Sequence, residues 1–167
     1  MLSFLRPAAI LASLVLLFAT TASAQSSTSP NGDVVLSVTG AVNKDPTLFD
    51  LEMLMALDET VIETTTIWTE GAQVFQGVAL DVLMETLGVT QGTLLATAIN
   101  DYTVEIPVSD AVAGGPIIAY KLNDATMSVR DKGPLWVVYP YDSSADYRSE
   151  VIYSRSIWQL DRIEVVE

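Results

Sequence analysis

The sequence contains no cysteine and no histidine among its 167 residues. Without cysteine, the chain can form no disulfide bond and has no thiolate to act as a nucleophile or metal ligand. Without either residue type, Ser-His-Asp and Cys-His catalysis, the usual zinc sites, histidine-ligated haem and blue copper are excluded. The remaining chemistry belongs to carboxylates, hydroxyl groups, lysine, arginine and any cofactor that the chain binds.

Basic residues are also scarce. The chain has 8 lysine and arginine residues against 21 aspartate and glutamate residues, which gives a formal net charge of -13. This balance makes nucleic acid and anionic lipid headgroups poor partners and favours solubility. Most of the cations lie in the final quarter of the sequence, so a site for an anion is expected there. They are Arg130, Lys132, Arg148, Arg155 and Arg162.

The N-terminus has the pattern of a secretory signal peptide. Arg6 precedes an apolar run over 8–19, and Ala22-Ser23-Ala24 provides a cleavage site before Gln25. The run is shorter than the roughly 20 residues that span a bilayer, which argues against an uncleaved membrane anchor. We therefore expect a signal peptide over 1–24, a flexible leader over 25–32 and one domain over 33–167, with no membrane span after cleavage. A signal without a twin arginine indicates a Sec-like route to a periplasmic or secreted location.

Apolar and β-branched periodicity predicts an α+β domain with several short strands and two helices. The clearest helix runs from Leu80 to Leu87 and ends at Gly88, because glycine accommodates a left-handed conformation. A shorter helix is expected over 49–57, capped by Thr47 or Asp50. An Asn100-Asp101 turn predicts a hairpin, and a bend is expected near Asp161-Arg162. The expected strands are 34–38, 61–67, 73–76, 93–99, 102–106, 117–122, 135–139 and 157–165.

Ordered segments over nearly all of the mature chain carry a resemblance to one family. They are Leu36-Ser37-Val38-Thr39-Gly40-Ala41-Val42, Trp68, Phe75-Gln76-Gly77-Val78-Ala79-Leu80, Asn100-Asp101-Tyr102 through Pro107, Lys132-Gly133-Pro134-Leu135-Trp136-Val137-Val138-Tyr139-Pro140, and Ser154-Arg155-Ser156-Ile157-Trp158 through Val165. In this order they resemble the molybdopterin-binding domain of the sulfite oxidase family. The resemblance implies an α+β fold of the sulfite-oxidase type, mixed and mostly β, with a few short flanking helices. It also implies a molybdopterin cofactor, which carries a phosphate and a dithiolene-bound molybdenum.

The resemblance also implies which residues hold the phosphate. Arg155 stands at the family's phosphate-binding position, between Ser154 and Ser156. A guanidinium fork suits phosphate oxygens, and the flanking hydroxyls supply further hydrogen bonds. The alternative is that Arg155 pairs with one of the many acidic residues. Arg130 either converges on the same anion or belongs to a solvated loop.

Five further residues are candidates for cofactor contacts. The resemblance places Asn100 and Tyr102 at the cofactor. Trp68 either lines a pocket or belongs to the core, since tryptophan buries much apolar surface. Tyr139 and Tyr141 flank Pro140, and such a pair either shapes the mouth of a pocket or closes a turn.

At one position the sequence departs from the family. Catalytic members bind molybdenum through a cysteine, and Thr64 stands at about that place. A threonine hydroxyl is a far weaker acid than a thiol and rarely ionises to bind a metal. No metal ligand and no catalytic residue is therefore assigned.

Two functions remain open at the level of sequence. One is an exported oxidoreductase that uses molybdopterin and binds its phosphate through Arg155. The other is a metal-free periplasmic binding or sensory module, which captures a small anionic ligand or a periplasmic or membrane-protein partner on the same fold. The loss of the cysteine and the Sec-like signal favour the second.

Overall fold

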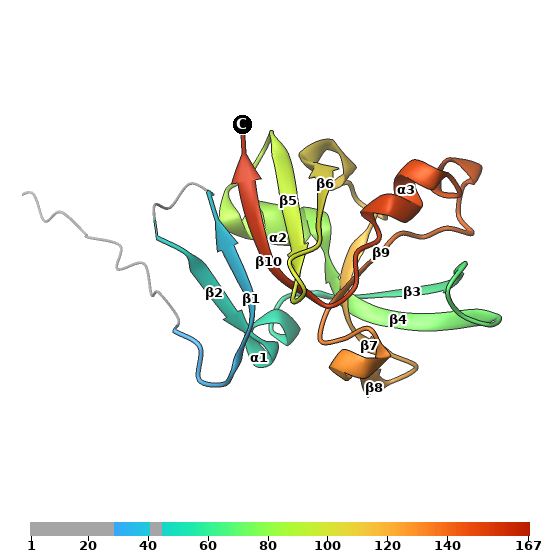
Figure 1. Ribbon diagram of the computed structural model, residues 1–167, viewed down its shortest axis with the longest axis horizontal. Helices are drawn as coiled ribbons and strands as arrows, with labels where there is room; N and C mark the ends of the chain where they lie inside the picture. Colours follow the sequence, from blue (N-terminus) through green and yellow to red (C-terminus); the bar gives the residue numbers. More distant parts are fainter. Residues whose placement is uncertain (1–28, 41–44) are drawn as a thin grey trace, which may run out of the picture.

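The computed structural model describes residues 29–40 and 45–167. The expected signal peptide and residues 25–28 of the expected leader lie outside the described residues. No helix within the two described ranges has the length and apolar character needed to cross a membrane. In these ranges the protein is a mixed α+β structure in which strands dominate (Figure 1).

One five-stranded sheet, sheet A, has the strand order β2-β1-β10-β5-β6. β1 runs parallel to β10, with Val38 opposite Ile163, and the other neighbours are antiparallel. The start and the end of the domain are therefore joined inside one sheet (Figure 1). The strands are β1 (Val34–Thr39), β2 (Thr47–Asp50), β5 (Thr93–Ala98), β6 (Thr103–Pro107) and β10 (Leu160–Val166).

The second sheet, sheet B, has the order β3-β4-β7-β8, and β9 also pairs with β7. β3 and β4 form a hairpin in unbroken register, from Glu59 opposite Val78 to Thr65 opposite Ala72. This hairpin extends sideways from the body of the molecule (Figure 1). The strands are β3 (Glu59–Thr65), β4 (Ala72–Ala79), β7 (Ile117–Leu122), β8 (Ala125–Thr126) and β9 (Trp136–Val138).

The helices are short and have local caps. α1 (Leu51–Met55) begins after Asp50, whose carboxylate accepts a hydrogen bond of 2.8 Å from the Met53 N–H. α2 (Leu80–Leu87) ends at Gly88, where φ is 69°. α3 (Glu150–Arg155) begins after Ser149, whose hydroxyl caps the Ile152 N–H. Single 3-10 turns lie at η1 (Val108–Asp110), η2 (Val129–Asp131) and η3 (Ala145–Tyr147).

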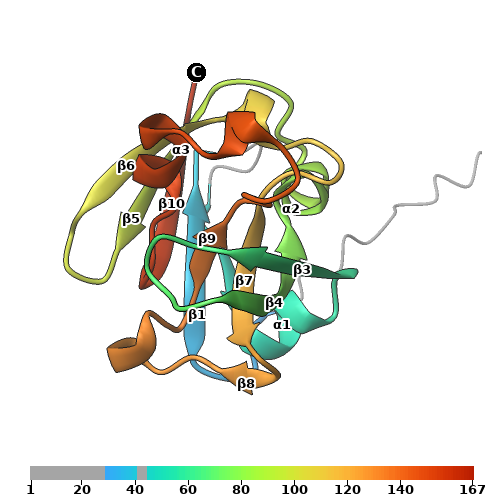
Figure 2. The ribbon, with the colours of Figure 1, turned by 90° about the vertical axis from the view of Figure 1, so that its right-hand side faces the viewer.

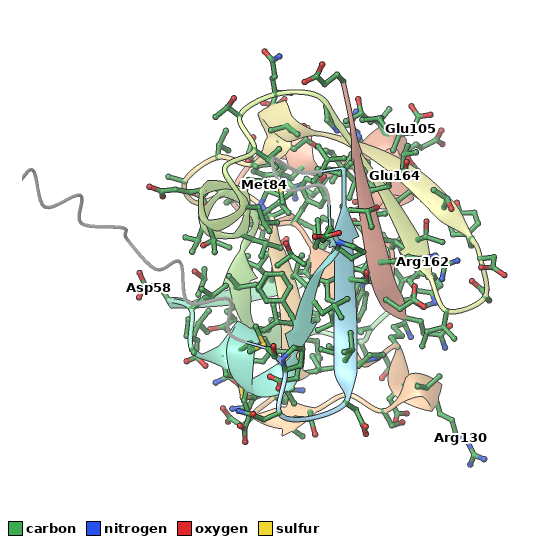
Figure 3. The ribbon with its side chains drawn as sticks, turned by 90° about the vertical axis from the view of Figure 1, so that its left-hand side faces the viewer. Asp58, Met84, Glu105, Arg130, Arg162 and Glu164 are labelled. Atoms are coloured by element: carbon green, nitrogen blue, oxygen red, sulfur yellow. The ribbon has the colours of Figure 1, made fainter. Side chains whose placement is uncertain are left out.

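One hydrophobic core joins both sheets and α2. Removal of this apolar surface from water is the main force that stabilises a fold without disulfides. Figure 3 shows Met84 of α2 within the body of the molecule, and its side chain is buried. Other fully buried side chains are Leu36, Phe75, Leu83, Leu94, Ile117 and Trp136.

The structure confirms the mostly-β α+β class, the strand 117–122, the helix Leu80–Leu87 and the hairpin turn before Tyr102. The expected bend in the last strand is a register shift between Leu160 and Arg162. The 49–57 helix is shorter than expected, because Phe49 and Asp50 pair with β1 before α1 begins.

Three further differences have local causes. The strand expected to end before Gly77 continues to Ala79, because β4 pairs with β7 on both sides of this residue. Glycine permits the close approach, since a side chain at Gly77 would collide with the carbonyl oxygen of Ile118 on β7. The last strand begins at Leu160 and not at residue 157, since Gln159 has a φ of 54° that interrupts an extended chain. α3 was not expected, because its apolar periodicity covers little more than one turn.

Candidate functional site

A cavity of about 370 Å³ lies where four separate segments of the chain meet. The β3–β4 turn supplies Trp68, the β5–β6 turn supplies Asn100 and Tyr102, the end of α3 supplies Tyr153 and Ser154, and the segment before β10 supplies most of the remaining wall. Five of the residues expected to contact a cofactor line it together, although they are far apart in sequence, from Trp68 to Ser156. The lining is Trp68, Ala98, Asn100, Tyr102, Tyr153, Ser154, Ser156, Ile157, Trp158 and Gln159. We call it the aromatic cavity.

Aromatic rings that pack edge to face form the wall of the aromatic cavity. The Trp68 ring lies 5.6 Å from Trp158 and 5.8 Å from Tyr153, in edge-to-face geometry. Behind them, the fully buried Trp136 lies 5.9 Å from Trp68 and joins the wall to the core. Trp68 therefore does both things proposed for it: it lines a pocket and packs on the core. Such rings offer a rigid, flat, apolar surface to a ligand.

The cavity also presents hydrogen-bonding groups. The Ser156 hydroxyl accepts a hydrogen bond of 2.6 Å from the Tyr141 hydroxyl and donates one of 2.8 Å to the Ile152 carbonyl. The Asn100 side-chain oxygen accepts from the Tyr102 N–H. Within the described part of the chain, the Trp158 indole N–H and the Tyr102 hydroxyl form no hydrogen bond, so they are available to a ligand.

Tyr139 and Tyr141 do not form the mouth of a pocket, because both are fully buried. Tyr141 supports the aromatic cavity from behind through its bond to Ser156, and burial raises its pKa to about 12. Tyr139 donates a hydrogen bond of 2.8 Å to Asp110, and burial, followed by this hydrogen bond, raises its pKa further. Neither phenol ionises near neutral pH.

A second cavity of about 520 Å³ adjoins the first and shares Tyr102 and Ser154 with it. Arg155 lines this second cavity and not the aromatic one. Its Nη1 donates a hydrogen bond of 2.8 Å to Asp110, and the Tyr139 hydroxyl donates to the same carboxylate oxygen. The alternative of an ion pair with an acidic neighbour is thus observed. The other guanidinium N–H groups have no hydrogen-bond partner among the described residues.

Thr64 lies outside both cavities. Its side chain is 1% exposed, and its hydroxyl accepts a hydrogen bond of 3.1 Å from the Asp142 N–H. In return the Asp142 carboxylate accepts bonds from the Thr65 N–H and hydroxyl, at 2.6 and 2.8 Å. The Thr65 N–H is the largest of the contacts that hold the pKa of Asp142 below its ordinary value. We call this the Thr64–Asp142 junction.

The junction does not fit a molybdenum ligand. The Thr64 oxygen is engaged with backbone groups and faces no cavity, and a hydroxyl retains its proton where a thiol would lose it. In the ranges that the structure describes, no three carboxylates gather as they would around a metal ion. Thr64 is therefore not placed to supply the metal ligand that the resemblance implies.

Arg130 does not join Arg155. It lies in η2, lines neither cavity, and points away from the body of the molecule (Figure 3). The structure thus places Arg130 on an exposed loop and does not bring it to the cavity that contains Arg155. The neighbouring Lys132 is closer to the site, since its Nζ lies 5.6 and 5.8 Å from the ring centroids of Trp136 and Trp158.

Sequence reasoning missed Tyr153, Trp158 and Gln159 as lining residues. Trp158 could have been found, because it follows Ser156 closely in the segment that carries the resemblance. Tyr153 and Gln159 are placed by α3 and by a left-handed backbone turn, and neither has a local signature. Comparison with known protein families finds no matching family, and comparison with curated protein sequences finds no match either.

Proposed function

We propose that this protein is an exported, metal-free binding module of sulfite-oxidase-type fold, whose ligand lies in the aromatic cavity. The ligand has a flat ring system with polar edges and an anionic group such as phosphate. The observation that carries this proposal is the gathering of Trp68, Asn100, Tyr102 and both serines around one cavity, next to a second one that contains Arg155.

The two cavities suit the two parts of such a ligand. A flat ring packs against Trp68 and Trp158, and the free indole and phenol groups bond to its edge. The cavities share Tyr102 and Ser154, so the ligand can extend into the second cavity, where the unpaired N–H groups of Arg155 donate hydrogen bonds to the anion. Arg155 is already paired with Asp110, which offsets part of its positive charge. A bound anion would share Arg155 with this carboxylate, so we expect moderate affinity.

An oxidoreductase is disfavoured by the position of Thr64. Its hydroxyl is buried in the junction with Asp142, and the aromatic cavity has no carboxylate in its lining to move a proton. The same pocket can bind a compound without converting it, because binding requires complementary shape and hydrogen bonds alone.

The first experiment measures metal and pterin content. The full chain is purified from the periplasm of a molybdate-fed host, and molybdenum is determined by plasma mass spectrometry beside a fluorescence assay for oxidised pterin. We expect folded protein without stoichiometric molybdenum. Near-stoichiometric molybdenum together with pterin would show a cofactor enzyme with an unusual ligand and overturn the metal-free proposal.

The second experiment tests the two cavities by calorimetry with a pterin monophosphate and the same pterin without phosphate. Trp158→Ala should weaken the binding of both compounds about tenfold or more, whereas Arg155→Ala should weaken the binding of the phosphorylated compound alone. Val112→Ala is the matched control, because Val112 is exposed and lines neither cavity. Equal affinity of the wild type and Trp158→Ala for both compounds would exclude the aromatic cavity as the site.

A further inference from the structure

β3 is the last strand of sheet B, and it pairs only with β4. Figure 2 shows β3 toward the viewer, with β4 along one side of it. A strand in this position has a row of backbone N–H and C=O groups directed away from the sheet, and such a row can pair with another chain.

Three hydrogen bonds identify the residues that form this row. The Thr65 N–H bonds to Asp142 and therefore points away from β4. Val74, which lies opposite Glu63, exchanges bonds with Asn123 beyond β7 and so turns its backbone away from β3. Backbone direction alternates along an antiparallel ladder, so the outward groups belong to Val61 and Glu63 as well as Thr65.

The outward row is closed at one end and open along the rest. Asp142 occupies the Thr65 N–H, and in the described part of the chain the outward groups of Val61 and Glu63 bond to nothing. Of the features that protect natural edge strands, β3 has no proline, no lysine and no bulge, and its charged residues are both acidic, Glu59 and Glu63. Val61 is 54% exposed on this strand.

The charge around the open edge is negative. Glu59 and Glu63 are exposed on the same face as Val61, and Asp58 projects from the chain just before β3 (Figure 3). Glu70 lies in the turn of the hairpin, and Asp142 closes the far end, where Arg148 is the nearby cation. A second copy of this chain would bring the same acidic edge and a net charge of -13, so pairing between two copies is opposed by repulsion.

We infer that the open edge of β3 binds an extended, lysine- or arginine-containing segment of a partner protein, which adds to sheet B as a further strand. Main-chain hydrogen bonds to Val61 and Glu63 provide the pairing, and basic side chains beside Glu59 and Glu63 select the partner. This site is independent of the aromatic cavity, because none of the β3 residues lines it.

The test uses the full chain and a short fluorescent peptide of alternating lysine and valine. Binding is measured by fluorescence anisotropy at low salt, and hydrogen exchange is followed by NMR. We expect the amides of Val61 and Glu63 to gain protection on binding. Val61→Pro, which removes one outward N–H at an edge position where proline is tolerated, should weaken binding about tenfold. Val61→Thr keeps the N–H and is the matched control.

Two further comparisons separate the outcomes. Glu63→Lys should weaken binding of the lysine peptide, and a peptide with glutamate in place of lysine should not bind to the wild type. Absence of binding at millimolar lysine peptide, or equal binding by Val61→Pro and wild type, would overturn the proposal even if the cavity binds its ligand. A dimer in sedimentation that Val61→Pro dissociates would overturn the choice of a basic partner and identify a second copy as the occupant.

Discussion

The Thr64–Asp142 junction and the aromatic cavity use their polar groups in opposite ways. At the junction, the Thr64 hydroxyl and both carboxylate oxygens of Asp142 are bonded to β3 and to the chain after β9. At the cavity, Tyr102 is 58% exposed and Trp158 is 37% exposed, and the polar atoms of their side chains have no partner in the described chain.

The difference shows that two positions joined by a family resemblance can have different physical roles in one molecule. Polar groups that satisfy each other inside a fold contribute to stability and are closed to a ligand. Exposed aromatic groups contribute little to stability and can bind something else. Substitutions at the junction should therefore change stability, and substitutions at the rim of the cavity should change binding.

The largest expected effect comes from Trp136, which supports the cavity from the core. Its ring packs on Trp68, Phe75 and Trp158, and its indole N–H donates to the Ser156 carbonyl. Trp136→Ala should lower the free energy of unfolding by about 3–5 kcal/mol in urea titrations, and it should also abolish ligand binding. A loss below about 1 kcal/mol would show that the cavity wall is not part of the core.

A smaller effect is expected at the junction. Thr64→Val keeps the shape of the side chain and leaves the Asp142 N–H without its acceptor, so stability should fall by about 1–2 kcal/mol. Thr60→Val is the matched control, because Thr60 lies on the same face of β3 and its hydroxyl makes no hydrogen bond within the described ranges. Ligand affinity should be unchanged in both variants. A loss of affinity in Thr64→Val alone would show that the junction affects binding in the aromatic cavity.

Acid should weaken the junction before it affects the cavity. The pKa of Asp142 is lowered in the folded protein, chiefly by the Thr65 N–H, so its contribution is complete above the unfolded value of about 3.9 and is lost as the pH falls through the folded pKa. Stability should be flat from pH 7 to about pH 5 and fall below about pH 4.

Asp50 makes a pH-dependent contribution to stability in the same direction as Asp142, because hydrogen bonds from the Gly32 and Met53 N–H groups lower its pKa. Asp142→Asn should therefore reduce the loss of stability in acid without removing it, because Asp50 still contributes. Urea unfolding at a series of pH values measures this, and an identical acid limb in Asp142→Asn would show that the carboxylate does not stabilise the junction.

The smallest stability effect is expected at the rim. Tyr102→Ala removes an exposed ring that makes no side-chain hydrogen bond in the described structure, so the free energy of unfolding should change by about 0.5 kcal/mol or less. Binding of the pterin monophosphate should nevertheless weaken strongly, because Tyr102 lines both cavities. Unfolding and calorimetry on the same preparation test the contrast with Thr64→Val.

The elements were predictable where local chemistry determines them. The apolar positions of α2 and the glycine after it set both ends of that helix, and β7 has the limits that its β-branched run indicates. The predicted ends of elements were wrong where pairing with a distant strand determines them. Phe49 and Asp50 pair with β1 and so do not belong to the expected helix, and pairing with β7 extends β4 past Gly77.

The membership of the candidate site was predictable in part. The resemblance indicated Trp68, Asn100, Tyr102, Ser154 and Ser156, and these residues line one cavity. Arg130, Tyr139 and Tyr141 were candidates on other grounds, a local positive charge and an aromatic pair around Pro140, and the structure places these three elsewhere, on an exposed loop and inside the core.

The sequence by itself determined the residue types, and so the absence of thiolate and imidazole chemistry, the acidic charge and the periods of the main strands and helix. Only the tertiary structure decided which polar groups are already bonded. Asp110 reaches Arg155 over 45 positions and Asp142 reaches Thr65 over 77, and no local period records a contact of that range. Whether a side chain is available to a ligand depends on such distant partners, and for that reason it follows from the fold and not from spacing along the chain.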